Sequence, residues 1–515
     1  MKGFFDHIRS VYGYQKIDNN INAMKEIILK SIFCMAFTML CILSRSAGPI
    51  NKHPDNPHYF IYNGKPLILI TTDQHYGAVI NLDFDYIGFL NRLQEYGMNL
   101  TRIYPGGYVE IKDQYIKGNP LGPAPDHYIL PWKKSAVTGA SPFLGSYKYD
   151  LDKWNPDYFD RLKDFVYQAS VRNIIVEVAF FNGMYDDRWM MQPLYHSNNI
   201  QGVGTCDFKQ FTTLADKGLV DFQINYVKKI ASELYQFDNL IYDISDEPEM
   251  QRQDSWGWND VILDALISAD KNRHLYGETA NSASPDFTGD KRTSWIPTEY
   301  VSPMENTLDK DYDDNKPIVN VETDYYPFWY GANPVEESRA EGWYGILGGV
   351  AGLIHLNSDF SVQNPTASGT ETQSKILPQK KVLMSFMYSL DFIRMKKFTG
   401  FSVSDTGLLA RGIAEPGKQY ALYLFHGNRK WSEWPQGATS DRFNVYIGWF
   451  LDTVKIDLPH GKYIIEWINP SSGTLIDSSL QDWKGGTLIL KTPQYQTDIA
   501  LRMICSSESK EIIKT

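Results

Sequence analysis

The stretch Leu240-Ile-Tyr-Asp-Ile-Ser-Asp-Glu-Pro-Glu-Met250 begins as an apolar strand and ends in a cluster of carboxylates. Its first five residues have the aliphatic and aromatic side chains of a buried parallel strand, and Pro248 cannot continue the pairing. Asp246 and Glu247 are therefore predicted at the carboxyl end of the strand, where α/β proteins place their active sites. A single glutamate at such a position is at least as often a solvated loop residue or a helix-capping group as a catalytic one. A second glutamate in the same position on another strand therefore strengthens the catalytic interpretation.

A second stretch, Pro317-Ile-Val-Asn-Val-Glu-Thr-Asp-Tyr325, repeats the pattern with Glu322 at the end of a β-branched run. About 75 residues separate Glu247 from Glu322, which fits three strand–helix units of about 25 residues each. If the first stretch is the fourth strand, the second is the seventh, and both glutamates lie on one rim. Two carboxylates on one rim predict acid/base or nucleophilic chemistry.

Apolar runs alternate with helical stripes over residues 58–395, and eight strand–helix units can be counted. The predicted strands are 67–72, 98–104, 174–181, 240–244, 274–278, 298–301, 317–322 and 351–357. This order predicts an α/β fold, a (β/α)8 TIM barrel, with a doubly wound open sheet as the alternative. A long irregular insertion, 108–154, is predicted to wall a cleft, and residues 184–215 form a second insertion.

Beyond Phe398 the pattern changes to short strands separated by turn clusters, which is typical of a small antiparallel β-sandwich. The predicted domains are residues 1–48, an over-extended start and signal peptide; 49–398, the catalytic barrel; 399–506, a β-sandwich accessory domain; and 507–515, a tail.

The N-terminal region has the features of a secretory signal peptide. Met24-Lys-Glu-Ile-Ile-Leu-Lys30 precedes an apolar run, and Ser44-Arg-Ser-Ala-Gly48 supplies small residues for cleavage. The sequence therefore predicts a signal starting near Met24 and a secreted or periplasmic protein. A membrane anchor is the alternative, although an apolar run of about 13 residues is short for a bilayer. Lipoprotein anchoring through Cys41 stays open but is not favoured.

Composition and charge favour a neutral ligand. The net charge of −11 argues against nucleic acid and anionic membranes as partners, because phosphate binding depends on Lys and Arg. The absence of a Gly-rich phosphate loop argues against a nucleotide, and no His pair has metal-ligand spacing, so no cofactor or metal is predicted. Outside the predicted signal only Cys206 and Cys505 remain, and whether they pair is left open. The oligomeric state is not readable.

Asp246-Glu-Pro248 and Glu322 resemble the Asn-Glu-Pro and strand-seven glutamate signature of the clan A, cellulase-like (family 5 type) retaining glycoside hydrolases. The resemblance covers roughly residues 58–395. It implies Glu247 as acid/base, Glu322 as nucleophile, and a polysaccharide or oligosaccharide substrate. The C-terminal region resembles the collagen-binding-type modules that follow such barrels. A non-catalytic carbohydrate- or protein-binding surface protein on a barrel scaffold is the alternative, because fold does not imply function.

The resemblance also implies roles for neighbouring residues. Arg102 matches the arginine that holds the nucleophile, and Tyr300 matches the tyrosine that hydrogen-bonds it. Asp246 departs from the usual Asn, which replaces a donor to the sugar by an acceptor and leaves the configuration of the sugar open. Further residues at strand ends are expected to line the sugar pocket, with loop hydrogen bonding or core packing as the alternative: His75, Tyr76, Asn182, Trp329, His355 and Asn357.

The chemistry requires two different glutamates. The general acid must be protonated at the working pH, and a carboxylate-rich rim would raise its pKa, whereas an adjacent arginine would keep the nucleophile ionised. A retaining pair is expected to lie about 5 to 5.5 Å apart. The identity of the sugar, its linkage, and endo or exo action depend on the insertions and are not readable from the sequence.

Overall fold

The computed structural model describes residues 48–73, 76–113, 118–141, 144–247, 256–278, 291–299, 312–322, 326, 331–403, 407–433 and 439–506. The chain divides into two compact units, Met1–Gly48 and Pro49–Thr515. The predicted signal peptide lies outside the described residues except for Gly48, and secretion stays a prediction. Within the described part of the chain, no helix combines the length and the apolar character needed to cross a membrane.

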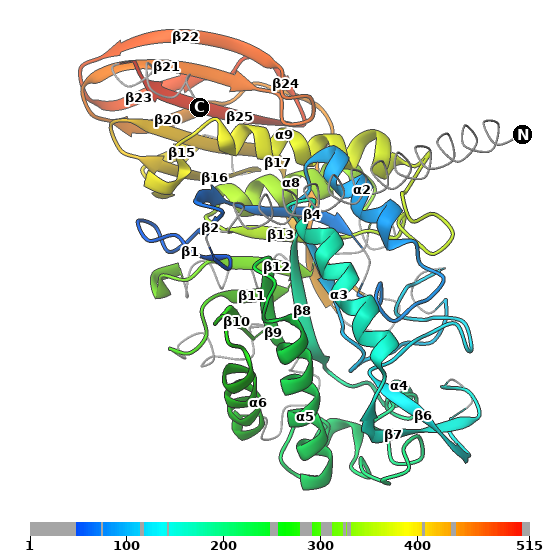
Figure 1. Ribbon diagram of the computed structural model, residues 1–515. Coiled ribbons are helices and arrows are strands. Elements are labelled where there is room, and N and C mark those ends of the chain that lie inside the picture. Colours follow the sequence, from blue (N-terminus) through cyan, green and yellow to red (C-terminus); the bar gives the residue numbers. More distant parts are fainter. Residues whose placement is uncertain are drawn as a thin grey trace, which may run out of the picture. The chain divides into compact units, whose positions relative to one another are not determined.

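Eight parallel strands form the centre of the second unit (Figure 1). They are β4 (Leu69–Asp73), β5 (Leu100–Ile103), β8 (Ile175–Asn182), β9 (Leu240–Asp246), β10 (Leu275–Gly277), β11 (Ile296–Glu299), β12 (Ile318–Glu322) and β13 (Gly352–Leu356). They make two four-stranded sheets, ordered β10-β9-β8-β5 and β11-β12-β13-β4. Their order is the one predicted, and each lies within a few residues of its predicted position. Almost every residue on both strand faces is buried, as in parallel sheets covered by helices.

Individual hydrogen bonds link the neighbouring edges of the two sheets. The side chain of Asn99 accepts from Ile70 N at 2.8 Å and donates to Ile68 O at 2.7 Å, which ties the start of β4 to the start of β5. On the other side, Ser294 N donates to Tyr276 O at 2.7 Å, between β10 and β11. Buried backbone groups at both edges therefore find partners.

Helices follow most of the strands. They are α2 (Tyr86–Tyr96), α3 (Pro156–Ser170), α4 (Asp186–Trp189), α5 (Lys217–Leu234), α6 (Trp256–Ala269), α8 (Pro334–Leu347) and α9 (Leu377–Tyr388). Single turns are η2 (Phe208–Gln210), η4 (Tyr312–Asp314), η5 (Thr372–Ile376) and η6 (Phe392–Arg394). Helix α2 has the usual signals at both ends. The Asp85 side chain caps its start by accepting a hydrogen bond from Gly88 N, and Gly97 ends it in the left-handed conformation, with a φ of 77°. The connections after β10 and β11 include residues 279–290 and 300–311, which lie outside the described part.

Two small antiparallel elements flank the parallel strands. The sheet of β1 (Asn51–Lys52), β2 (Phe60–Tyr62) and β3 (Lys65–Leu67) contains the predicted turn at Asn63 and Gly64, both at positive φ. The prediction of an irregular first insertion was wrong in part, because β6 (Trp132–Thr138) and β7 (Tyr147–Trp154) form a hairpin within it. The two exposed lysines and the serine of β6 do not follow the apolar pattern by which a strand is recognised.

The C-terminal region is built from antiparallel strands. They are β14 (Lys396–Lys397), β15 (Phe401–Val403), β16 (Leu408–Glu415), β17 (Gln419–Glu433), β18 (Thr439–Val445), β19 (Trp449–Phe450), β20 (Thr453–Leu458), β21 (Gly461–Ile468), β22 (Leu475–Trp483), β23 (Gly486–Lys491), β24 (Tyr495–Gln496) and β25 (Asp498–Cys505). One sheet has the order β14-β16-β17-β25-β21-β22, with β18 paired to β17, and a second has the order β15-β20-β23. Residues of both sheets share one apolar cluster, which includes Tyr463, Leu501 and Ile456. The boundaries of an accessory domain stay a prediction. Cys206 and Cys505 are not joined by a disulfide bond.

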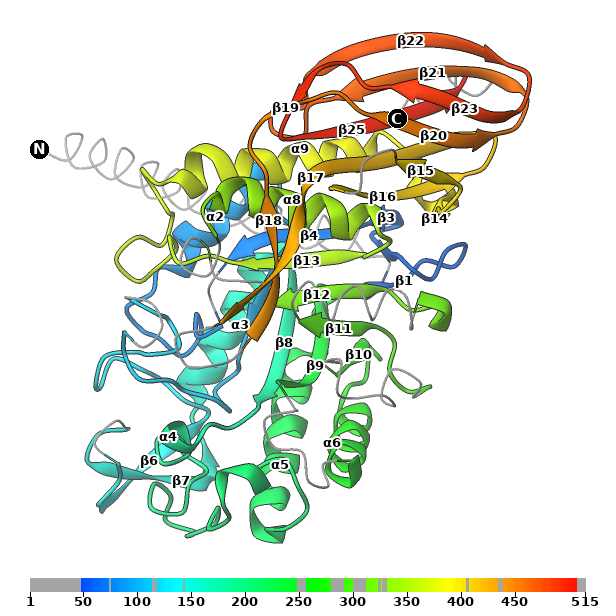
Figure 2. The same cartoon turned by 180° about the vertical axis from the view of Figure 1, so that it is seen from behind.

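Helix α8 packs against the C-terminal strands (Figures 1 and 2). Trp343 stacks on Tyr423 with ring centroids 5.6 Å apart, and Tyr344 meets Phe443 edge-on at 5.0 Å. Arg339 makes a bidentate ion pair with Asp498, at 2.7 and 3.0 Å, and both residues are buried. The parallel strands and the C-terminal strands therefore share one apolar core.

Candidate active site

A fully buried arginine lies among carboxylates contributed by three other strands. The Arg102 guanidinium on β5 is 2.9 Å from Glu177 on β8, and 3.1 and 2.7 Å from Asp243 and Asp246 on β9. Its Nη1 atom is 3.6 Å from Glu322 Oε2, at the end of β12. The resemblance implied the contact between Arg102 and the strand-seven glutamate, and the structure brings these two residues together.

Strand register explains why these side chains meet. Arg102 and Glu177 are direct partners in the β5–β8 ladder, and Asn182 and Asp246 are partners in the β8–β9 ladder. In-register residues of parallel strands point to the same side of a sheet, so they form layers. The layer nearest the carboxyl ends carries Asp246, which is followed directly by Glu247.

The charges of the cluster do not balance locally. Burial raises the pKa of Glu177 and Glu322 well above the ordinary value, nearby carboxylates add to the rise, and Arg102 opposes it. The pKa of Asp73, at the end of β4, is raised to about 7, again mainly by burial. One guanidinium faces several carboxylates here, which is why the pKa of Glu177 and that of Glu322 are raised although Arg102 lies beside both.

Asp246 is held from three sides. It accepts hydrogen bonds from Arg102 at 2.7 Å, from Asn182 Nδ2 at 3.2 Å, and from the Tyr104 hydroxyl. Its side chain is fully buried, so Asp246 positions its three hydrogen-bond partners beneath the surface of the site. The contact of Asp246 with the sugar, which the resemblance implies, stays a prediction.

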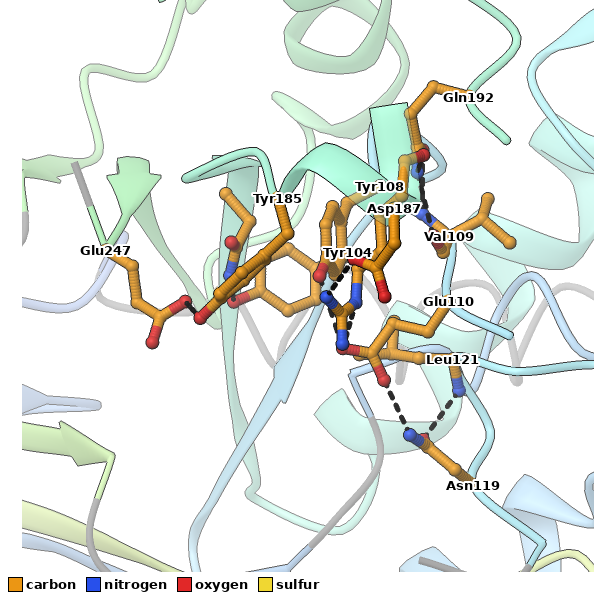
Figure 3. A network of polar contacts seen from close by, with 12 residues as sticks. Tyr104, Tyr108, Val109, Glu110, Asn119, Leu121, Tyr185, Asp187, Gln192 and Glu247 are labelled. Atoms are coloured by element: carbon orange, nitrogen blue, oxygen red, sulfur yellow. Dashed lines mark hydrogen bonds and ion pairs between the residues drawn. The ribbon is translucent and has the colours of Figure 1, made fainter. Parts of the chain in front are cut away.

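Glu247 has an unusual backbone conformation. Its φ is 44°, in the left-handed region that residues other than glycine rarely adopt. Such strain is typical of functional sites and persists where the surrounding fold imposes it. The partly buried carboxylate accepts a hydrogen bond of 2.6 Å from the Tyr185 hydroxyl (Figure 3).

The two insertions meet behind Tyr185. The Arg188 guanidinium lies 4.4 Å from the centre of the Tyr185 ring, and its Nε atom is 3.9 Å from Glu110. Glu110, from the first insertion, also accepts a bond of 2.7 Å from Asn119 and one of 3.2 Å from Tyr108 (Figure 3). Burial raises the pKa of Glu110 to about 7, although Arg188 opposes the rise. The network supports the ring that contacts Glu247.

The other predicted site residues have different surroundings. Tyr76 joins the cluster: its ring meets Tyr104 at 5.3 Å and receives the Arg102 guanidinium, also at 5.3 Å. Asn182 donates to Tyr104 at 2.9 Å as well as to Asp246. Asn357 is used structurally, because its amide donates to Thr72 and to a second threonine after β13. His75, Tyr300 and Trp329 lie outside the described residues.

The expectation that His355 lines a sugar pocket does not fit its position. Its ring contacts Glu341 of α8 at 2.9 Å and Lys380 of α9, so it points outward to the helices. Burial lowers the pKa of His355 to about 4, and it lowers that of Lys380 to about 7. This buried group ties β13 to its two covering helices.

The sequence interpretation missed Tyr104, Glu110, Glu177, Tyr185, Arg188 and Asp243. Glu177 and Asp243 carried a readable signal, because each is a charge inside an otherwise apolar strand. Such charges are costly to bury unless they are paired. Tyr185, Arg188 and Glu110 lie in insertions without periodicity, so no pattern linked them. Within the described residues, no group of His, Cys, Asp and Glu side chains is arranged to hold a metal ion.

Solved structures share this fold at low sequence identity. A structure named glycoside hydrolase superimposes with a TM-score of 0.58 at 12% identity, over 90% of this chain and 98% of its own. A glycoside hydrolase family 5 protein from Bacteroides vulgatus gives 0.57 at 13% identity, over 90% and 94% of the two chains. A putative glycoside hydrolase from the same organism gives 0.58 at 14% identity, over 89% and 82%. The chain shares the fold of these glycoside hydrolase structures. No protein-family model and no curated protein matches the sequence.

These matches cover about nine-tenths of the chain, so they include part of the C-terminal strands as well as the parallel ones. Family 5 structures are TIM barrels, which agrees with the eight parallel strands in sequence order. At these identities the similarity establishes the fold alone.

Proposed function

We propose that the protein is a secreted retaining glycoside hydrolase that cleaves O-glycosidic bonds in a polysaccharide or oligosaccharide. The main support is the placement of Glu247 and Glu322 at the ends of β9 and β12, with Arg102 buried beside Glu322. The similar structures are named glycoside hydrolases, which supports the same reaction class. Export rests on the signal-like N-terminal sequence.

In the first step, the Glu322 carboxylate attacks the anomeric carbon and the bond to the leaving oxygen breaks. Glu247 gives that oxygen its proton, so the leaving sugar departs as an alcohol and a glycosyl ester remains on Glu322. In the second step, Glu247 takes a proton from water, and the resulting hydroxide displaces Glu322 from the anomeric carbon. Two displacements return the original configuration.

The electrostatics set a condition on pH. Glu322 must be ionised to attack, but burial, Asp246 and Glu247 raise its pKa, and Arg102 lowers it by a smaller amount. The acidic limb of the activity profile is therefore expected above the ordinary titration range of a glutamate.

Two variants test the assignment. Glu322→Ala removes the nucleophile and should abolish turnover on every substrate. Glu247→Ala removes proton transfer, about 10² to 10⁴ in rate, which an activated aryl glycoside hardly needs in its first step. This variant should accumulate the glycosyl intermediate, and azide should accelerate its release.

The anomeric configuration of the product, followed by NMR, tests the mechanism. An inverted product, or near-normal turnover by Glu322→Ala, would refute the two roles. If the folded chain binds a polysaccharide but cleaves none, a non-catalytic binding protein replaces the glycoside hydrolase as the proposed function.

A further inference from the structure

A short segment of the C-terminal region exposes an unusual amount of apolar surface. In Tyr446–Leu451, the exposed fractions are 41% for Tyr446, 50% for Ile447, 66% for Trp449 and 69% for Leu451. Single exposed apolar residues are ordinary on protein surfaces, but four within six positions form a contiguous stretch of the kind that marks binding sites.

The segment is held in place by the neighbouring strands. Trp449 and Phe450 form β19, which pairs with β24, and Tyr446 N donates to His426 O at 2.8 Å. The Phe450 ring turns inward and stacks on His426 with centroids 3.9 Å apart. Because side chains alternate along a strand, Trp449 and Leu451 then point outward. The pairing of β19 with β24 therefore holds the exposed Trp449 indole in a fixed position.

The residue just before the segment is tied to the start of α8, the helix that follows β12. Asn333, which caps the start of α8, donates from Nδ2 to Val445 O at 3.3 Å. Helix α8 follows β12, so its first residues lie on the side of the barrel where Glu322 ends that strand. Figure 2 shows β18 running beside α8 and leading into β19. The exposed segment thus continues from a strand whose end contacts the first residues of α8.

The chemistry of the segment selects a neutral ligand. Residues 443–451 include no Lys, Arg, Asp or Glu, so nothing there attracts a phosphate or a charged peptide. Flat aromatic faces bind the C–H faces of sugar rings through apolar contact, and Ile447 and Leu451 extend the apolar area.

We propose that Tyr446 and Trp449 form an accessory binding surface for a neutral glycan, which holds the part of a long substrate chain that extends beyond the reaction site. The proposal rests on the proposed glycosidase function and adds that the substrate is polymeric. It also gives the C-terminal region a role in recognising that substrate.

The test uses the full chain with Tyr446→Ala and Trp449→Ala combined, and Tyr167→Ala as the control. Tyr167 is 53% exposed on α3 and has no part in the proposed surface. Binding to insoluble cellulose, galactomannan and arabinoxylan is measured by depletion from solution, in a Glu322→Ala background that does not degrade the polymer. Loss of two stacking contacts of about 1 kcal/mol each should weaken binding at least tenfold, whereas the control variant binds normally.

The same substitutions in the active chain should raise KM for the polymer but leave hydrolysis of an aryl glycoside within about twofold. Unchanged binding by the double variant, or retention of none of these polymers by the intact chain, would overturn the proposal. A concentration-dependent dimer that the double variant abolishes would overturn it in favour of a second copy of the chain. Weakened polymer binding together with normal turnover by Glu322→Ala would refute the catalytic roles and leave the surface standing.

Discussion

At the scale of single residues, Tyr185 offers the sharpest test of the proton-transfer group. Its hydroxyl donates to Glu247 at 2.6 Å, which favours the charged carboxylate. Tyr185→Phe removes that donor, so Glu247 should keep its proton to higher pH and the basic limb of kcat should move upward. A hydrogen bond to a charged group is worth about 1.5 to 3 kcal/mol, which corresponds to a shift of about one to two pH units.

The measurement is the pH dependence of kcat on an aryl glycoside, with Tyr167→Phe as the control, since that hydroxyl belongs to an exposed helix residue. A purely structural role of Tyr185 would lower kcat equally at all pH values. An unmoved basic limb would therefore exclude Tyr185 as a positioning residue for Glu247.

Asp73 makes a prediction about stability and pH. Burial raises its pKa from 3.8 to about 7, so the folded chain keeps this proton at pH values where the unfolded chain has lost it. The stabilisation is fully present below about pH 4 and is lost as pH rises through 7. Asp73→Asn removes this titration. The variant should gain stability relative to the wild type between pH 4.5 and 8, by up to about 4 kcal/mol.

Thermal melting of the wild type and of Asp73→Asn at pH 4.5 and at pH 8 measures the gain in stability. A difference in Tm that does not change with pH would show that Asp73 is ionised in the folded chain at both values.

At the scale of elements, the Arg339–Asp498 pair fastens α8 to β25. Asp498→Asn removes the charge and leaves a buried guanidinium without its counter-ion, which costs about 3 to 5 kcal/mol. The control is Asp221→Asn, which breaks the exposed Lys217–Asp221 pair within α5 and should cost less than about 1 kcal/mol. Urea unfolding of both variants compares the two. Equal losses would mean that the buried pair contributes nothing specific.

The elements also explain what the sequence could reveal. The strands carrying Glu247 and Glu322 were recognisable because a buried run ends abruptly in carboxylates. Arg102 was named because the resemblance implies an arginine beside the nucleophile at this strand. In a parallel sheet both strand faces are buried, so apolar alternation does not tell inside from outside. For that reason the sequence placed His355 at the pocket, whereas the structure turns it toward α8 and α9.

At the scale of the whole molecule, the C-terminal strands cover part of the barrel surface. Trp343 and Tyr344 of α8 pack against Tyr423 and Phe443 within the shared core. Removal of residues 399–515 would expose this apolar face to water, so the truncated chain should aggregate or melt at a clearly lower temperature. Solubility and Tm of the truncated chain measure this. A soluble truncated barrel with an unchanged Tm would show instead that residues 399–506 are a separable accessory domain.

The Arg339–Asp498 pair joins residues 159 positions apart, and its second member lies on β25, which follows all the parallel strands in the sequence. A chain that emerges from the ribosome in order therefore cannot finish the outer face of α8 until β25 has been made. If the protein is exported, it should cross the membrane before this surface is buried. A chain that terminates anywhere before β25 should then be degraded completely by proteases, even where every residue of the reaction site has been made.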